Sequence, residues 1–530
     1  MKIKVHGYDN YKNYLPLFST LSKVFFCEFS DKFEDKDVIG HIIFTDNEII
    51  DVPQQSALIF SNNYVKEKSL MAIIRLNSLC FSEVKINDES FLTKSLELKK
   101  TVNIDPRYRI IASQGDQAIW YIDEQKLFKH YYSLIPPCNP ENHQSLKDNF
   151  NSEDFIRILP IITFLRELSK SDSLIYPSPK ASIIIDDPNL HRSKYGYIDY
   201  EQLITDAKTN GYHINLATIP LDLYYASKKV VKLFKNNSKY LSLIIHGNNH
   251  TSNELMVNSP NKAYSKLLKI KKRVDKFYQR YGIRVGNIII PPHGMMSREF
   301  LKIMSLFEFS GACVSRPFPW SSGKTVGTNI EENQNYSKLL PADFIEGTPI
   351  VPRMKDFNDI PFKLLLHIPL VFYFHHEDFK HGINNLGEIV ERINKYADVS
   401  WCSLINIFQA NYVIKKNTDK EAIVFLFSKN VIVDIPVGIE KVYFKIINNI
   451  GRSREMELWI NEEKYAMEYY NDNIYSSPEI IIDKRNNFNV QFNCVAEKEM
   501  LNLQPELNRL YPFIRRIITE SRDMIAPIFS

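Results

Sequence analysis

The chain has 530 residues, of which 44% are hydrophobic, and this length predicts two to four packed domains rather than a disordered chain. Its 66 Lys and Arg nearly balance its 62 Asp and Glu, which argues against the one-sided basic field of a nucleic-acid-binding protein. Glycine is scarce, at 17 residues, and Gly323-Lys324-Thr325 lacks the earlier glycine of a phosphate-binding loop. We therefore expect no nucleic-acid partner and no glycine-rich nucleotide site.

The first part of the chain predicts a small α/β domain with a linker, over 1–150. Short β-rich runs alternate with polar stretches, at 2–7, 23–29, 40–46, 56–61, 71–76, 109–113 and 118–123. The segment 135–154 is rich in Pro, Asn and charge, which indicates a linker leading into a helix over 155–170.

We predict the cellular compartment from the first residues of the sequence, its longest apolar windows and its cysteines. The first residues contain no apolar run of the kind a secretory signal peptide has, and the longest apolar windows fall short of the roughly 20 residues of a membrane span. Six widely spaced cysteines form no C-x-x-C motif. The expectation is a cytoplasmic protein with reduced thiols and no transmembrane segment.

The middle of the chain, over 151–410, predicts a parallel (β/α) barrel of about seven strands. Continuous apolar runs occur at 181–187, 212–218, 240–246, 287–293, 311–315, 348–352 and 368–375, with amphipathic stretches after several of them. Continuous rather than alternating hydrophobicity is typical of strands that are covered on both faces. The strand ends of such a barrel share one mouth, where a site would form.

The last part, over 411–530, predicts a β-sandwich-like domain with a terminal helix. Strand patterns follow one another at 422–428, 431–437, 441–447, 456–461, 479–483 and 489–495, separated by turn-like segments. An amphipathic helix is expected over 507–525.

Seven of the 13 histidines lie between His246 and His381, and several of them end predicted strands. His246 and His250 are four residues apart directly after a strand, which allows both rings to reach one ion, although such a pair also occurs by chance. Asp186 and Asp187 end the most apolar strand, where two acids are costly to desolvate unless a cation or a hydrogen-bond network compensates them.

The order of these motifs resembles the polysaccharide deacetylase superfamily, the carbohydrate esterases of family four. A strand ending in Asp-Asp is followed by a strand ending in His-x-x-x-His, by Pro-Pro-His-Gly at 291–294, and by an apolar strand ending at His375. The resemblance covers roughly 180–380 and implies a distorted (β/α)7 barrel that removes acetyl groups from N-acetylated sugars with one divalent metal.

The resemblance also implies roles for individual residues. Asp187, His246 and His250 would be the metal ligands, and Asp186 would be the general base. His293 occupies the position whose backbone N–H binds the oxyanion, and His375 would be the general acid, with His376 as the alternative if the strand boundary shifts by one.

Two positions depart from the family pattern. Ile290 stands where the family has an arginine that orients the catalytic acid, and Pro188 follows Asp-Asp in place of glycine. Arg316 or Arg353 could supply the missing cation. Trp320 could line the sugar pocket or pack within its loop, and His367 and His381 are expected to be ordinary core or surface residues.

The sequence thus predicts a metal-dependent deacetylase acting on an N-acetylated sugar or a surface-polysaccharide precursor. A non-catalytic carbohydrate-binding or assembly protein and a different metal hydrolase on the same scaffold are the alternatives. Two histidines and one aspartate suit zinc, and cobalt, nickel or iron would also accept this donor set. A homo-oligomer is compatible with the sequence.

Overall fold

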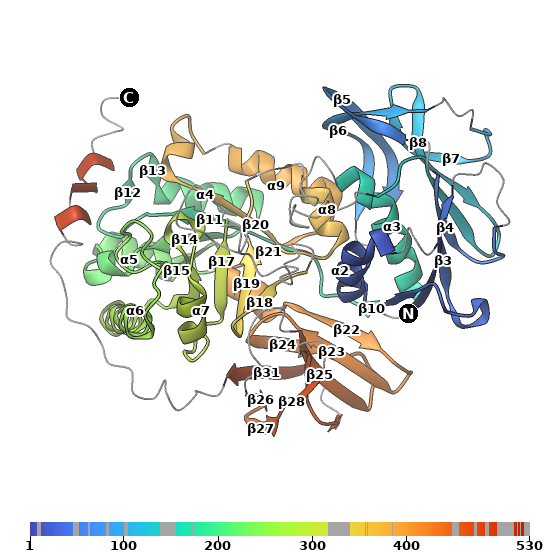
Figure 1. The fold of residues 1–530 in the computed structure, drawn as a ribbon. Coiled ribbons are helices and arrows are strands. Elements are labelled where there is room, and N and C mark those ends of the chain that lie inside the picture. Colours follow the sequence, from blue (N-terminus) through green and yellow to red (C-terminus); the bar gives the residue numbers. More distant parts are fainter. Residues whose placement is uncertain are drawn as a thin grey trace.

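A computed structural model describes most of the chain, and it shows three sheet-based parts joined by helices (Figure 1). The described residues are 1–7, 12–45, 52–61, 64–80, 84–99, 104–137, 155–171, 174–315, 340–355, 357, 359–383, 385–447, 455–470, 474–482, 487–494, 514–516, 518–519 and 521–523.

The N-terminal part is a nine-stranded mixed sheet in the order β2-β1-β3-β4-β9-β8-β7-β5-β6. Neighbours from β2 to β9 in this order are parallel and the rest are antiparallel. The strands are β1 (Lys2–His6), β2 (Glu28–Ser30), β3 (Gly40–Thr45), β4 (Ala57–Ser61), β5 (Tyr64–Cys80), β6 (Lys85–Leu98), β7 (Arg109–Gln114), β8 (Gln117–Glu124) and β9 (Lys129–Ser133).

One predicted strand of this part is wrong. Residues 23–25 belong to helix α2 (Leu15–Phe25), and only 28–30 form strand. The buried residues of α2 include Leu17, Leu21 and Val24, a spacing of three to four that places them on one helix face. The helical period over the whole segment therefore outweighs the β-propensity of the short run that ends it.

The central part contains all seven predicted strands, in the parallel order β19-β17-β16-β15-β14-β11-β20. They are β11 (Lys180–Asp186), β14 (Ile214–Thr218), β15 (Leu241–His246), β16 (Val285–Ile290), β17 (Gly311–Val314), β19 (Thr348–Pro352) and β20 (Leu370–Phe374). Their side chains are buried on both faces, as the continuous hydrophobicity predicts: Ile183, Ile184 and Ile185 are all 0% exposed.

Helices connect and cover the central strands (Figure 1). They are α4 (Tyr200–Asn210), α5 (Lys228–Asn236), α6 (Pro260–Tyr281), α7 (Arg298–Met304), α8 (Ile360–Leu365), α9 (Asn385–Tyr396) and α10 (Leu404–Gln409). Two short strands extend the sheet, β18 (Asp343–Ile345) antiparallel to β19 and β21 (Ser400–Trp401) beside β11.

The two ends of the central sheet meet at one bridge rather than through a continuous ladder. Met354, just after β19, donates its N–H to the carbonyl of Val371 at 2.8 Å and accepts one from Tyr373 at 3.3 Å. Pro349 and Pro352 have no N–H, which limits the ladder that β19 can form. The predicted closed barrel thus corresponds to a parallel sheet whose ends are joined at Met354.

The C-terminal part consists of two sheets that share one hydrophobic core. The first contains β10 (Leu174–Ile175), β22 (Tyr412–Lys416), β23 (Glu421–Leu426), β25 (Lys441–Ile447), β28 (Glu468–Tyr470), β29 (Ile474–Ser476) and β30 (Ile480–Ile481). The second has the order β24 (Asn430–Asp434), β31 (Asn487–Cys494), β26 (Met456–Ile460) and β27 (Glu463–Ala466). The alternating burial of β31 is typical of a strand with one face in a core.

Two segments link these parts. Helix α3 (Phe155–Ser171) contacts both the N-terminal sheet and α8, and β10, which follows it, pairs with β22 of the C-terminal part. At the far end of the chain, 514–516, 518–519 and 521–523 are helical, within the predicted terminal helix. Among the helices of the described residues, none is both long and apolar enough to cross a bilayer.

Candidate metal centre

Asp186 ends β11, Asp187 directly follows it, and the two side chains face different partners. Asp186 is the last strand residue and is 1% exposed. Asp187 has φ +76°, in the left-handed region, while its N–H still bonds the carbonyl of Ala217 at 3.1 Å. Because a non-glycine residue rarely adopts this conformation, the turn after the strand is a local cost that the surrounding contacts must offset.

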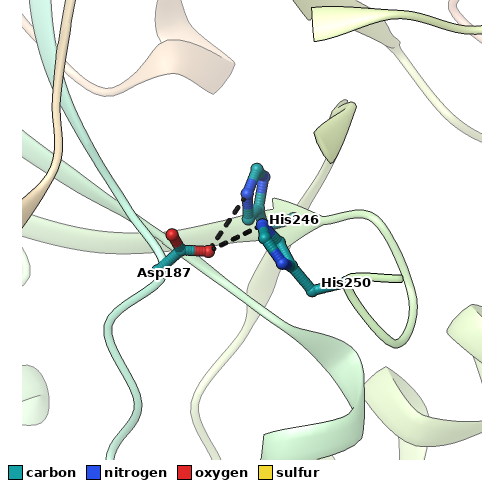
Figure 2. A group of neighbouring side chains, drawn as sticks. All are labelled: Asp187, His246 and His250. Carbon is teal, nitrogen blue, oxygen red and sulfur yellow. Dashed lines mark ion pairs between the residues drawn. The ribbon is translucent and has the colours of Figure 1, made fainter. Parts of the chain in front are cut away.

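Asp187, His246 and His250 form the candidate metal site (Figure 2). Asp187 Oδ1 lies 3.3 Å from His246 Nε2 and 3.1 Å from His250 Nε2, and one ligand atom from each residue lies within 4.8 Å of the others. The three side chains come from the end of β11, the end of β15 and the loop after β15.

The hydrogen bonding of His246 tests whether these residues suit a cation. Its Nδ1 lies 3.1 Å from the carbonyl oxygen of Ile290, which can only accept, so Nδ1 carries the proton. In the neutral ring, Nε2 then presents a lone pair to Asp187 Oδ1, a buried oxygen that accepts no hydrogen bond from the described residues. Two lone pairs at this distance suit a shared cation, and the carbonyl holds the ring in position.

The surrounding charges and burial shift the pKa values of the three candidate ligands in ways that also favour binding of a cation. Burial raises the pKa of Asp187, but His246, His250 and Arg516 outweigh it and hold this pKa well below its usual range. Burial lowers the pKa of His250 to about 4, which leaves that ring neutral and able to bind a metal. Burial also lowers the pKa of His246, but Asp186 and Asp187 raise it further, so a cation would take the place of a proton there.

Glu254 holds the loop that carries His250. Its buried carboxylate accepts the backbone N–H groups of Asn248, Asn249 and His250 at 2.9 to 3.0 Å. Gly247 begins this loop with φ +59°, and a Cβ there would lie 2.5 Å from Pro292. A glycine is therefore needed where the loop passes the Pro-Pro turn.

Arg273, on α6, also holds this loop through hydrogen bonds. Its Nη1 donates to the backbone carbonyl and side-chain oxygen of Asn248, at 2.9 and 2.6 Å, and to the side-chain oxygen of Asn249 at 2.7 Å. Neither Glu254 nor Arg273 was predicted from the sequence. The only indication was an acid four residues after His250 in a loop with few other charges.

Arg353 pairs with Asp186, whereas Ile290 stands where the motif resemblance implies an arginine. Its Nη1 donates to both carboxylate oxygens of Asp186, at 2.8 and 2.6 Å, and both side chains are almost completely buried. The Arg353 guanidinium also lies 4.2 Å from the ring centroid of Tyr373, an arrangement typical of a cation–π contact. Of the two arginines suggested by the sequence, Arg316 lies outside the described residues, as does Trp320.

His375 and His376 directly follow β20 and contact different residues. His375 Nε2 is 3.8 Å from Asp186 Oδ2, and 40% of the side chain is exposed. His376 is buried against Tyr195 and Tyr197, away from Asp186. Of the two alternatives, the structure places His375 beside the acid.

Of the other histidines of the cluster, His293 lies beside the candidate metal site, and His367 and His381 do not. The ring of His293 lies beside that of His250, with centroids 5.8 Å apart, and its backbone has φ +60° in the turn after Pro292. His367 stacks on Tyr176 at 3.6 Å, where burial lowers its pKa well below the usual value, and His381 is exposed. The last two are not among the residues around Asp187.

Two arginines from the far end of the chain reach the ligand residues. Arg516 donates to the backbone carbonyl of Asp187 at 3.2 Å, and its Nη2 lies 2.7 Å from a carboxylate oxygen of the buried Asp222. Arg515 donates to the backbone carbonyl of His250. Since both arginines lie more than 260 residues after His250, no local sequence pattern could have identified them.

Comparisons with known proteins were made for the sequence and for the structure. No family model and no curated protein sequence matches the chain. Solved structures that align with it include a putative polysaccharide deacetylase from Mycobacterium smegmatis (10% identity, 44% of this chain and 91% of that one, TM-score 0.31). A family 4 carbohydrate esterase from Streptomyces lividans also aligns (10%, 41% and 86%, 0.24).

A GH57-type branching enzyme from Pyrococcus horikoshii aligns to a similar extent (10% identity, 43% of this chain and 69% of that one, TM-score 0.26). The deacetylase and esterase alignments each cover less than half of this chain. With TM-scores this low, the alignments do not by themselves assign an activity.

Proposed function

We propose that the chain is a metal-dependent hydrolase that removes an acetyl group from an N-acetylated sugar or a surface-polysaccharide precursor. The observation that carries the proposal is the juxtaposition of the Asp187–His246–His250 site with Asp186, which is paired with Arg353 and lies 3.8 Å from His375. A divalent cation held by the three ligands, zinc by preference, would act as a Lewis acid on the acyl carbonyl. The choice of an acetamido sugar depends on the motif resemblance.

The chain's own residues would carry the protons. Asp186 accepts a proton from the attacking water while the two hydrogen bonds from Arg353 fix its carboxylate. As the carbon–nitrogen bond breaks, His375, which is partly exposed, gives a proton to the departing amine and acetate is released. The turn at His293 would present a backbone N–H to the oxyanion, as the family motif implies.

The alternative of a non-catalytic binding or assembly protein was based on the missing arginine at Ile290. Arg353 makes a two-point contact with Asp186, so this basis is weakened.

The metal site and the reaction are tested separately. Asp187→Ala and His246→Ala should lower bound metal from about one ion per chain to near zero by elemental analysis, because each removes a ligand. His381→Ala, an exposed histidine outside the site, should keep its metal. Unchanged metal content in both ligand variants would refute the site.

Activity is measured as acetate release from a panel of acetamido sugars and acetylated oligosaccharides. Asp186→Asn should keep its metal and lose acetate release by about 10²-fold or more, because it removes the base. Acetate release equal to that of the unmodified protein would remove Asp186 from this role. If no saccharide yields acetate while metal is bound, the deacetylase proposal fails.

A further inference from the structure

A cleft of about 760 Å³ lies between the central and C-terminal parts, away from the metal site. One side is formed by the starts of β16 and β17 together with α10, and the other by the second sheet of the C-terminal part. Its lining residues are Asn287, Ser310, Ile405, Gln409, Asn430, Val431, Ile432, Trp459, Asn461, Glu462, Asn489, Val490, Gln491 and Asn493.

The cleft and the metal site lie at opposite ends of the central strands. Asn287 is near the start of β16, whereas the carbonyl of Ile290 that supports His246 is at its end, and Ser310 directly precedes β17. The candidate ligands of the metal site lie at or just after the carboxyl ends of β11 and β15. A molecule in this cleft would therefore occupy a site distinct from the candidate metal centre.

The chemistry of the lining is unusual for this chain. Seven of its 14 residues are Asn or Gln, whereas the whole sequence has 45 Asn and 12 Gln among 530 residues. Each side-chain amide can both donate and accept hydrogen bonds. Glu462 is the one charged residue of the lining, so the cleft is polar but nearly free of charge.

Strand register explains how these side chains come to one surface. Trp459 pairs with Gln491, and Gln491 pairs with Asn430, so three strands contribute one cross-strand row. In the same way, Asn489 pairs with the exposed Ile432. Since alternate residues of β31 are buried in the core, this row belongs to the outward face of the sheet.

Hydrogen bonds between lining residues already hold part of the cleft in one conformation before any ligand binds. Asn430 Nδ2 donates to Ser310 Oγ at 3.3 Å, and Ser310 Oγ donates to Asn287 Oδ1 at 2.8 Å, which joins the two sides of the cleft. Within the described part of the chain, no hydrogen bond involves the side chains of Gln409 and Asn489. The cleft thus has one part held by hydrogen bonds and, beside it, side-chain amides that can bond to a polar ligand.

Trp459 adds an aromatic surface to these amides. The indole is partly exposed, and Lys464 Nζ lies 5.8 Å from its ring centroid. A sugar ring has apolar C–H groups on one face and hydroxyls around its edge, so it needs an aromatic surface together with groups that both donate and accept. We infer that this cleft is a second binding site for an uncharged oligosaccharide.

The inference is independent of the proposed reaction and is tested by binding alone. The full chain is applied to an array of immobilised neutral and acidic oligosaccharides, together with Trp459→Ala and Gln491→Ala. Retention on neutral glycans is expected for the unmodified chain and should fall at least tenfold in both variants. Tyr470→Ala is the matched control, since it removes an exposed aromatic ring from the other sheet of the same part.

The Asp187→Ala variant tests whether glycan binding depends on the candidate metal site. It should bind the array as well as the unmodified chain does, because Asp187 does not line the cleft. Three outcomes would overturn the inference. They are the absence of retention on any neutral glycan, equal retention by Trp459→Ala and the unmodified chain, and retention that is lost in Asp187→Ala but kept in Trp459→Ala. A failure of acetate release would leave the binding result unaffected.

Discussion

Two adjacent aspartates face different partners in this protein because the backbone turns between them. Asp186 remains in β11 and pairs with Arg353, whereas Asp187 leaves the strand with φ +76° and faces two histidines. The left-handed conformation of Asp187 costs on the order of 1 kcal/mol relative to an ordinary one. That cost separates a candidate base from a candidate ligand within one dipeptide.

Arg353 gives the sharpest test at the residue scale. Arg353→Ala should lower acetate release about 100-fold with metal content retained, because Asp186 loses the contacts that orient it. Arg353→Lys should recover part of the activity, since it restores the charge but not the planar guanidinium that lies over Tyr373. Activity is compared at matched folded fractions, measured by circular dichroism, because removing one partner of a buried pair also destabilises the fold.

Arg298 provides the control for this substitution. It is partly exposed and pairs with Glu346 at 2.7 Å rather than with Asp186, so Arg298→Ala should leave acetate release unchanged. A loss in Arg353→Ala no larger than that in Arg298→Ala would mean that Arg353 does not position the acid.

At the scale of single elements, the seven central strands could be predicted because continuous burial leaves a strong pattern in the sequence. The segment 23–29 was predicted wrongly because a short β-rich run ended an amphipathic helix. That Asp187, His246 and His250 come together could also be predicted, since each ends a strand or follows one closely. Glu254 could not, because an acid that bonds three backbone N–H groups looks like any loop acid until the loop is folded.

The loop over 247–250 should depend on Glu254 for its shape. Glu254→Gln keeps the size of the side chain but replaces the charged acceptor of three N–H groups, so we expect metal affinity to fall about 10- to 100-fold. The measurement is competition with a chelator of known affinity. Glu308→Gln, an exposed acid on the same part, should have no effect, and equal affinities in the two variants would contradict this role for Glu254.

At the scale of the whole molecule, the parts are joined by contacts that sequence patterns do not reveal. The two-residue strand β10 precedes the central sheet yet pairs with β22 of the C-terminal part. Lys429, between β23 and β24, is buried and donates to the backbone carbonyls of Ser305 and Phe307 at 2.5 and 3.4 Å. These contacts depend on how the sheets pack, and therefore a mixed α/β fold with several sheets could be predicted, but not the way its parts are joined.

Because Lys429 is buried, we expect the free energy of unfolding to depend on pH. Burial lowers its pKa from 10.5 to about 8, so between pH 8 and 10.5 the unfolded chain binds a proton there that the folded chain does not. Stability from this group therefore rises as pH increases through that window, by about 3 kcal/mol in total, and is lowest below pH 8. Other groups titrate at alkaline pH as well, so the comparison is with Lys429→Met.

Denaturant unfolding at pH 7.5 and pH 9.5 measures the difference. The stability of the unmodified chain minus that of Lys429→Met should be larger at pH 9.5, because only the unmodified chain sheds the cost of a buried charge. Lys441→Met, at an exposed lysine, serves as the control for loss of a surface charge. A difference that does not change with pH would show that Lys429 is not the titrating group.

The arginines that hold the carbonyls of Asp187 and His250 have a consequence for biosynthesis. Arg515 and Arg516 leave the ribosome after both sheets of the C-terminal part, whereas the central strands that carry the ligands are made much earlier. Domains generally fold in the order in which they are synthesised. The central sheet can therefore form while the chain is still growing, but its candidate metal site takes its final shape only after residue 516 has been translated and has folded back onto it.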